Sequence, residues 1–128
     1  MPNWVTNEIT FNFDMSHEKD RFMKLVTSDD NVFDFNNIVP MPENIFKAES
    51  GTRDWCCENW GTKWNSCNAS LDWEDEDDVG FIFDTAWSAP TPIAVNLKRM
   101  FKGISFRWFY RDEFDMFCGY LDDDIGGS

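Results

Sequence analysis

The sequence is poor in positive charge and in histidine. It has 11 lysines and arginines against 24 aspartates and glutamates, which gives a formal net charge of -13, and it has one histidine. A surface of that sign repels phosphate backbones, so we do not expect direct binding to nucleic acid. A basic protein that normally holds nucleic acid would instead be attracted, over a long range and in a salt-dependent way.

Long apolar runs and a secretion signal are also missing. No stretch approaches the roughly 18 consecutive apolar residues that cross a bilayer, and residues 1–7 lack the charged and apolar regions of a leader. We therefore expect no membrane partner and a location in the cytosol of the host cell. In that compartment the four cysteines should be reduced rather than bridged.

The residues for a catalytic or metal site are sparse and badly spaced. The lone His17 falls in the first turn of an expected surface helix, and no glycine-rich phosphate loop occurs. Cys56 and Cys57 are adjacent, and Cys67 and Cys118 show no paired spacing, so a zinc site is not indicated. We expect no enzyme activity, no cofactor and no metal, with a small enzyme of unfamiliar site as a remote alternative.

Large apolar side chains are plentiful by contrast. The chain has 13 phenylalanines and 7 tryptophans, and 42% of its residues are hydrophobic. That supply offsets the entropy of ordering the chain, so an acidic disordered tail is excluded. A length of 128 residues suits one domain, 1–128.

Hydrophobic periodicity predicts an α+β fold. Period-two alternation indicates strands, and apolar residues three and four positions apart indicate helices. In chain order, the expected elements are a strand over 5–13, a helix over 16–27, an irregular insert over about 28–63 with helical turns near 43–47 and 53–60, strands over 67–73 and 79–87, a helix over 91–101, and strands over 104–110 and 114–120.

This order is buried most simply as an antiparallel sheet with both main helices on one face. We predict a ferredoxin-like sheet with an extra edge strand and an irregular helical insert. The strands over 67–73 and 79–87 should form a hairpin, because the link between them is short. The acidic tail over 122–128 should be frayed.

Four segments resemble a known family. They are PNWVTNEITF near the start, FDFNNIVPMPENI over 33–45, NWGTKWN over 59–65 and FDTAWSAPTP over 83–92. They resemble the YubB ferredoxin-like family of proteins from phages, plasmids and integrated mobile elements. The resemblance implies a ferredoxin-like domain from a mobile element and brings no catalytic residue. Ala89 stands where the family has proline, so the loop before the last helix should differ.

The most unusual segment is an acidic run over 72–78, which holds six carboxylates in seven residues. Residues 64–97 contain seven acids and no lysine or arginine, so they carry -7 of the net charge of -13. The run could occupy a phosphate site of a partner, as DNA mimics do, or it could be a solvated hairpin tip. A calcium loop is a third reading, although a turn glycine is lacking. The carboxylates are Asp72, Glu74, Asp75, Glu76, Asp77 and Asp78.

Tryptophans gather in two of the family segments. Trp60, Trp64 and Trp87 could form an exposed anchor for a partner, because tryptophan concentrates binding energy at interfaces. They could equally pack the insert onto the sheet and close one end of the core. Lys63 could contact the partner on the same surface or extend along the rings to solvent.

These features predict an acidic, non-enzymatic binding protein from a phage or mobile element. We expect an inhibitor of a host defence nucleoprotein, with anti-CRISPR or anti-restriction activity, that blocks a basic nucleic-acid-binding surface. The partner would be a host protein or nucleoprotein complex. The alternative is an accessory module in replication or transfer of the element, which docks a partner through Lys98, Arg99, Lys102, Arg107 and Arg111.

Overall fold

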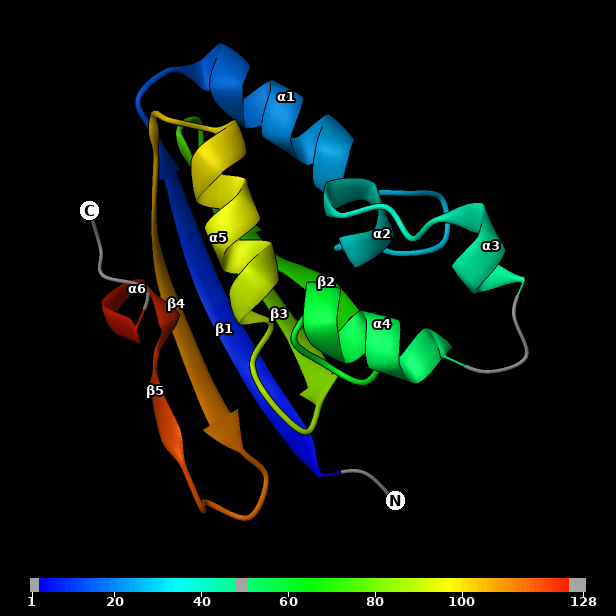
Figure 1. Ribbon diagram of the computed structural model, residues 1–128. Coiled ribbons are helices and arrows are strands. Elements are labelled where there is room, and N and C mark those ends of the chain that lie inside the picture. The colour runs from blue at the N-terminus through cyan, green and yellow to red at the C-terminus, as the bar shows by residue number, and fades with distance from the viewer. Residues whose placement is uncertain (1–2, 48–50, 125–128) are drawn as a thin grey trace.

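The chain forms one antiparallel sheet covered by helices on one side (Figure 1). The computed structural model describes residues 3–47 and 51–124. The strands are β1 Trp4–Phe13, β2 Cys67–Glu74, β3 Asp78–Ala86, β4 Ile104–Asp112 and β5 Cys118–Tyr120. The helices are α1 Ser16–Val26, α2 Phe35–Ile38, α3 Glu43–Phe46, α4 Thr52–Asn59, α5 Thr91–Met100 and α6 Leu121–Asp124.

The strand order is β2-β3-β1-β4-β5, with every neighbouring pair antiparallel. The central strand β1 pairs with β3 on one side and β4 on the other, so Glu8 lies between Ile82 and Phe109. Strands β1 to β4 with α1 and α5 make the ferredoxin-like arrangement, and β5 is the extra edge strand. The predicted fold class is confirmed.

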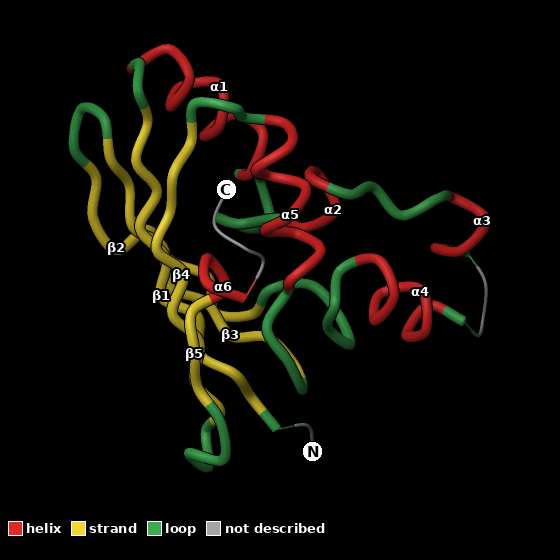
Figure 2. Tube along the Cα trace, turned by 60° about the vertical axis from the view of Figure 1, so that its left-hand side comes forward, coloured by secondary structure: helices red, strands yellow, loops and turns green. Residues whose placement is uncertain are grey.

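Alternation along β1 explains why the helices gather on one face. Val5, Ile9 and Phe11 are buried, whereas Glu8 and Asn12 between them are exposed. Figure 2 shows the helices on one side of the strands, and no helix of the described residues covers the other side. One face of the sheet therefore carries the core, and the other is open.

The core is built largely from aromatic rings centred on Phe11. Its ring lies 4.7 Å from that of Phe22 on α1, measured between centroids. Four further rings surround it at 5.8 to 6.1 Å, so strand and helix side chains meet in one cluster. These four belong to Phe33, Phe81, Phe106 and Trp108.

The insert is more helical than its sequence predicts, because α2 lies in a part of it where no helical turn was expected. The Asp34 side chain caps this turn by accepting from the backbone N–H of Asn36 at 3.0 Å. Asn65, far along the chain, donates to Asp34 at 2.8 Å and accepts from the Phe35 N–H at 2.9 Å. The helical turn thus depends on a partner that local periodicity does not reveal. The turns at α3 and α4 agree with the prediction.

The C-terminal hairpin corrects two expectations. Strand β5 starts at Cys118 rather than 114, because the Asp112 carboxylate accepts from the N–H groups of Phe114 and Met116 and holds a turn there. The tail expected to fray from 122 instead begins with helix α6. Leu121 is buried, and Asp122 accepts from the Trp108 N–H at 2.9 Å. Residues 125–128 of that tail lie outside the described residues.

Candidate partner-binding surfaces

The acidic run forms the tip of the β2–β3 hairpin, as expected, and the tip is clamped to the rest of the molecule. The Lys19 ammonium on α1 lies 2.7 Å from the Glu74 carboxylate and donates to the Asp75 carbonyl at 2.5 Å. The Phe13 N–H donates to the Asp77 carbonyl at 2.9 Å. These contacts come from β1 and α1, so the tip is held against the end of the core.

Only part of the carboxylate array is neutralised. Glu74 is paired with Lys19, and Asp78 accepts from the Asn12 amide at 2.6 Å. The side chains of Asp75, Glu76 and Asp77 are exposed and have no hydrogen bond or ion pair within residues 3–47 and 51–124. Sequence reasoning missed Lys19 as a counter-charge, because it lies more than 50 positions away from the run.

The acidic tip does not have the arrangement of side chains that a metal site needs. In the described part of the chain, no group of three or more histidine, cysteine, aspartate or glutamate side chains is placed to hold a metal ion. The free acids of the tip are charges exposed to solvent. Their chemistry is that of acceptors for cationic groups.

The tryptophans separate into a packing set and an exposed one. Trp60 is only 4% exposed, and its indole N–H donates to the Val39 carbonyl at 2.8 Å. Its ring meets Trp55 edge-on at 5.3 Å and Phe35 at 6.0 Å. This geometry favours the packing role for Trp60, which ties the insert to the core. Its ring is not available to a partner in this conformation.

Trp87 is the tryptophan of this group that faces solvent. It is 43% exposed and has a φ of 78°, the left-handed region that non-glycine residues rarely adopt. The Lys63 ammonium lies 4.8 Å from the Trp87 ring and 4.9 Å from the half-buried Trp64 ring. Lys63 is therefore held between two rings, and this cluster lies at the end of the sheet away from the acidic tip.

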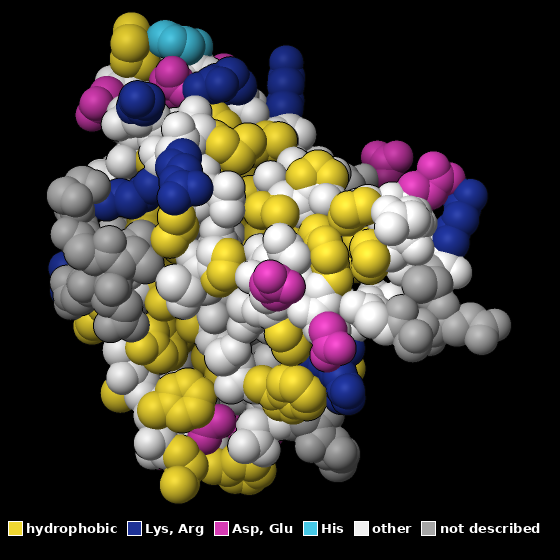
Figure 3. Space-filling view, in the orientation of Figure 1, with side chains coloured by type: hydrophobic (Ala, Val, Ile, Leu, Met, Phe, Trp, Pro, Cys, Tyr) yellow, Lys and Arg dark blue, Asp and Glu magenta, His cyan; other side chains and the backbone are white. Residues whose placement is uncertain are grey.

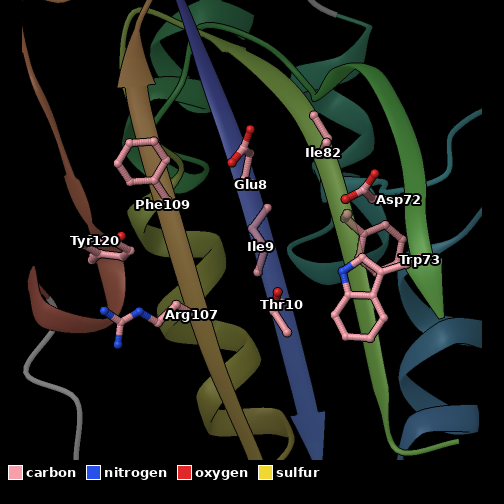
Figure 4. Close-up of a pocket in the computed structure, with 10 residues that line it drawn as sticks. Glu8, Ile9, Thr10, Asp72, Trp73, Ile82, Arg107, Phe109 and Tyr120 are labelled. Atoms are coloured by element: carbon pink, nitrogen blue, oxygen red, sulfur yellow. The ribbon is translucent and has the colours of Figure 1, made fainter. Parts of the chain in front are cut away.

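The open face of the sheet holds a hollow that sequence reasoning did not single out (Figure 4). Its volume is about 480 Å³. Its floor is formed by positions of β1 and β4 that alternate with the core positions. The sequence signal for the hollow was therefore this second, mostly polar set of positions along the two strands. Its lining includes Glu8, Thr10, Asp72, Trp73, Arg107 and Tyr120.

Four of the five basic residues proposed as one docking face lie on two faces. Lys98 and Arg99 belong to α5, which covers the core side, and Figure 3 shows lysine and arginine side chains gathered over the upper part of that helix. Arg107 and Arg111 are exposed positions of β4 that alternate with buried ones and so point to the open face. The structure does not assemble the five into one surface.

The nucleophilic side chains of interest are the lone histidine and the four cysteines. His17 is exposed near the start of α1, and all four cysteines are free. Burial raises the pKa of the Cys56 thiol to about 11, and the neighbouring Cys57 adds to the rise. At neutral pH Cys56 is protonated, which makes it a poor nucleophile.

Thiol labelling should follow this order of exposure. In the native protein at pH 8, Ellman's reagent is expected to modify Cys57 and Cys118 quickly, because both are exposed. Cys56 should react at least about a hundredfold more slowly, since it is buried and its pKa is about 11. Absorbance at 412 nm measures the rates, and alanine variants assign the phases. Equal rates for Cys56 and Cys57 would contradict the burial.

Comparison with known proteins identifies a family for this chain. A family described as "Ferredoxin-like domain in Api92-like protein" matches residues 59–126, which are 68 of 128 residues. The matched part contains the acidic tip and strands β2 to β5, and it omits the central strand β1. No curated protein and no solved structure matches. Within the described residues, no helix is long and apolar enough to cross a membrane.

Proposed function

Because the chain belongs to the family of ferredoxin-like domains in Api92-like proteins, we propose that it is a non-enzymatic binding protein of that family. Its acidic tip takes the place of nucleic-acid phosphates on a basic partner surface. The sequence resemblance to YubB proteins implied a ferredoxin-like domain, and the matching family is described as such a domain. The description of that family does not use the name YubB.

One observation carries the proposal: three adjacent exposed carboxylates on a clamped hairpin. Among the described residues, the side chains of Asp75, Glu76 and Asp77 have no counter-charge. Lys19 and Phe13 hold the backbone in place by donating to the Asp75 and Asp77 carbonyls. Preorganised charges lose little entropy on binding, so a fixed tip binds better than a flexible acidic tail. Carboxylates accept charge-assisted hydrogen bonds from the lysines and arginines that would otherwise hold phosphate.

The target class we infer is a host defence nucleoprotein, such as a CRISPR effector complex or a restriction enzyme. The net charge of -13 supports this class, because it attracts basic channels and repels free nucleic acid. The resemblance to proteins of mobile elements supports the host as the source of the target. An accessory role in replication or transfer is less favoured, because four of its five basic residues, Lys98, Arg99, Arg107 and Arg111, lie on two faces.

The test is displacement of labelled DNA from purified effector complexes and restriction enzymes. The triple variant Asp75→Asn, Glu76→Gln, Asp77→Asn removes the free tip charges. The control variant Asp29→Asn, Asp30→Asn, Glu58→Gln removes three exposed carboxylates elsewhere. We expect the tip variant to displace DNA about tenfold less well, since exposed pairs contribute about 0.5 kcal/mol each. The control should stay within about twofold of the unmodified protein.

Raising the salt concentration gives a second readout. Displacement by the unmodified protein should weaken steeply as salt rises, and the tip variant should show a shallower slope. Equal losses in the two triple variants would assign the effect to net charge rather than to the tip. Failure to displace DNA from every complex tested would contradict the proposed function itself.

A further inference from the structure

The open face of the sheet is a second surface with its own chemistry. Strand register places Ile82, Glu8 and Phe109 side by side in one row across β3, β1 and β4. Tyr120 on β5 continues that row beside Phe109. Neighbouring strands lie about 4.8 Å apart, so these side chains are close neighbours on one surface.

Aromatic rings form two opposite walls of the hollow. The Trp73 indole lies directly over Gly80, where any Cβ would collide with it, and it remains 39% exposed. The rings of Phe109 and Tyr120 lie 5.3 Å apart and form the other wall. Figure 4 shows the Trp73 indole across β3 and the Phe109 and Tyr120 rings on the side of β4 and β5.

Two carboxylates in this hollow have no cationic partner. Within residues 3–47 and 51–124, Glu8 and Asp72 make no ion pair and no side-chain hydrogen bond. Arg107 is diagonal to Glu8 in the register, yet its guanidinium lies over the Tyr120 ring at 4.5 Å. Figure 4 shows the Arg107 guanidinium directed away from Glu8. The carboxylate charge on the floor of the hollow is therefore available to an incoming cation.

We propose that this hollow binds an arginine side chain carried by a basic segment of a protein partner. The guanidinium is planar, so it stacks on an aromatic face while donating two hydrogen bonds to one carboxylate. Trp73 and Phe109 offer alternative faces on the opposite walls of the hollow, and Glu8 and Asp72 supply the acceptors. Lysine fits less well, because its ammonium is compact, more strongly hydrated and does not stack.

Charge decides between this occupant and a nucleic acid. Exposed aromatic rings on a sheet can stack with bases. Here the same surface carries the unpaired carboxylates of Glu8 and Asp72, and the chain has a net charge of -13, so phosphates are repelled. The proposal shares with the proposed function the basic character of the partner. Its surface includes Asp72 of the acidic run but none of the three free tip carboxylates, Asp75, Glu76 and Asp77.

Binding of a defined peptide tests the assignment. The probe is a blocked octapeptide of glycine and serine that carries two arginines, compared with versions that carry two lysines or two neutral citrullines. Isothermal titration calorimetry gives Kd, and the indole N–H signal of Trp73 in an NMR spectrum locates the site. We expect the arginine peptide to shift the Trp73 signal and to bind more tightly than either of the other two peptides.

Charge-matched variants then separate the hollow from the tip. Glu8→Gln should weaken arginine-peptide binding about tenfold, the loss expected for a hydrogen bond to a charged group. Glu76→Gln at the tip removes the same charge and should change Kd less than about twofold. Circular dichroism checks whether Glu8→Gln disturbs folding. If it does, Asp72→Asn on the exposed edge strand replaces it as the variant whose Kd for the arginine peptide is measured.

Three outcomes would overturn the proposal. Equal weakening by Glu8→Gln and Glu76→Gln would show diffuse attraction rather than a site. Absence of a Trp73 shift at millimolar peptide would show that the hollow does not take a guanidinium. A Trp73 shift with a single-stranded oligonucleotide but not with the arginine peptide would assign the face to nucleic acid. Each of these results leaves the DNA-displacement test of the tip unaffected, so the two ideas can fail separately.

Discussion

Replacing Phe11 by alanine is expected to lower the free energy of unfolding by about 3 to 5 kcal/mol. The ring is fully buried at the centre of the sheet and contacts rings from α1, the insert, β3 and β4. No single neighbour can move into the space, because the surrounding rings are fixed in four different parts of the fold. The loss therefore combines transfer of the ring to water with a persistent cavity.

Urea denaturation followed by circular dichroism measures this loss. Small domains are stable by only about 5 to 15 kcal/mol, so the Phe11→Ala variant should be near the limit of folding at 25 °C. The matched control is Phe46→Ala, which removes a ring that is 73% exposed and should change stability by less than about 0.5 kcal/mol. A loss below about 1 kcal/mol for Phe11→Ala would contradict the central role of its ring.

The sheet was predictable from the sequence where one face is buried and the other is open. Along β1 the apolar side chains of Ile9, Phe11 and Phe13 alternate with polar ones, and the structure buries those three. Edge strands give a weaker signal. In β2 the register shifts twice, so Asp72 and Trp73 both line the open-face hollow although simple alternation places them on opposite faces.

Elements that depend on distant partners were not predictable. Helix α2 is stabilised by Asn65, about 30 residues beyond it, and α6 by the contact of Asp122 with the β4 backbone. For the same reason the sequence indicated the acidic tip but not its clamp, because Lys19 reaches Glu74 only once α1 is packed on the sheet. Local patterns predict elements, whereas ion pairs across the fold require the fold itself.

A buried polar network on the core side of β1 is a further feature that alternation alone misreads. Asn7 is fully buried at a position where the pattern calls for an apolar side chain. Its amide oxygen accepts from the Trp108 indole N–H at 2.9 Å. Its amide nitrogen donates to the Thr85 hydroxyl at 3.0 Å and to the Val5 carbonyl at 3.2 Å. A polar side chain is retained here because it satisfies the indole N–H in the core.

Substitution Asn7→Leu should lower the free energy of unfolding by about 2 to 3 kcal/mol, although it keeps the number and branching of the side-chain heavy atoms and adds apolar surface. The cost arises because the Trp108 N–H is left buried without an acceptor, which the gain in hydrophobic burial does not offset. Trp108→Phe alone should also destabilise, since it leaves the Asn7 oxygen without its donor and opens a small cavity.

The double variant Asn7→Leu, Trp108→Phe removes both members of the pair and should be more stable than the sum of the single losses by about 1 kcal/mol or more. Chemical denaturation of the four proteins in this cycle gives the coupling energy directly. The comparison pair Asn7→Leu with Val26→Ala, two residues that share no hydrogen bond, should be additive within about 0.5 kcal/mol. Additivity in the Asn7–Trp108 cycle would mean that this hydrogen bond contributes nothing to stability, and burial of Asn7 would then need another cause.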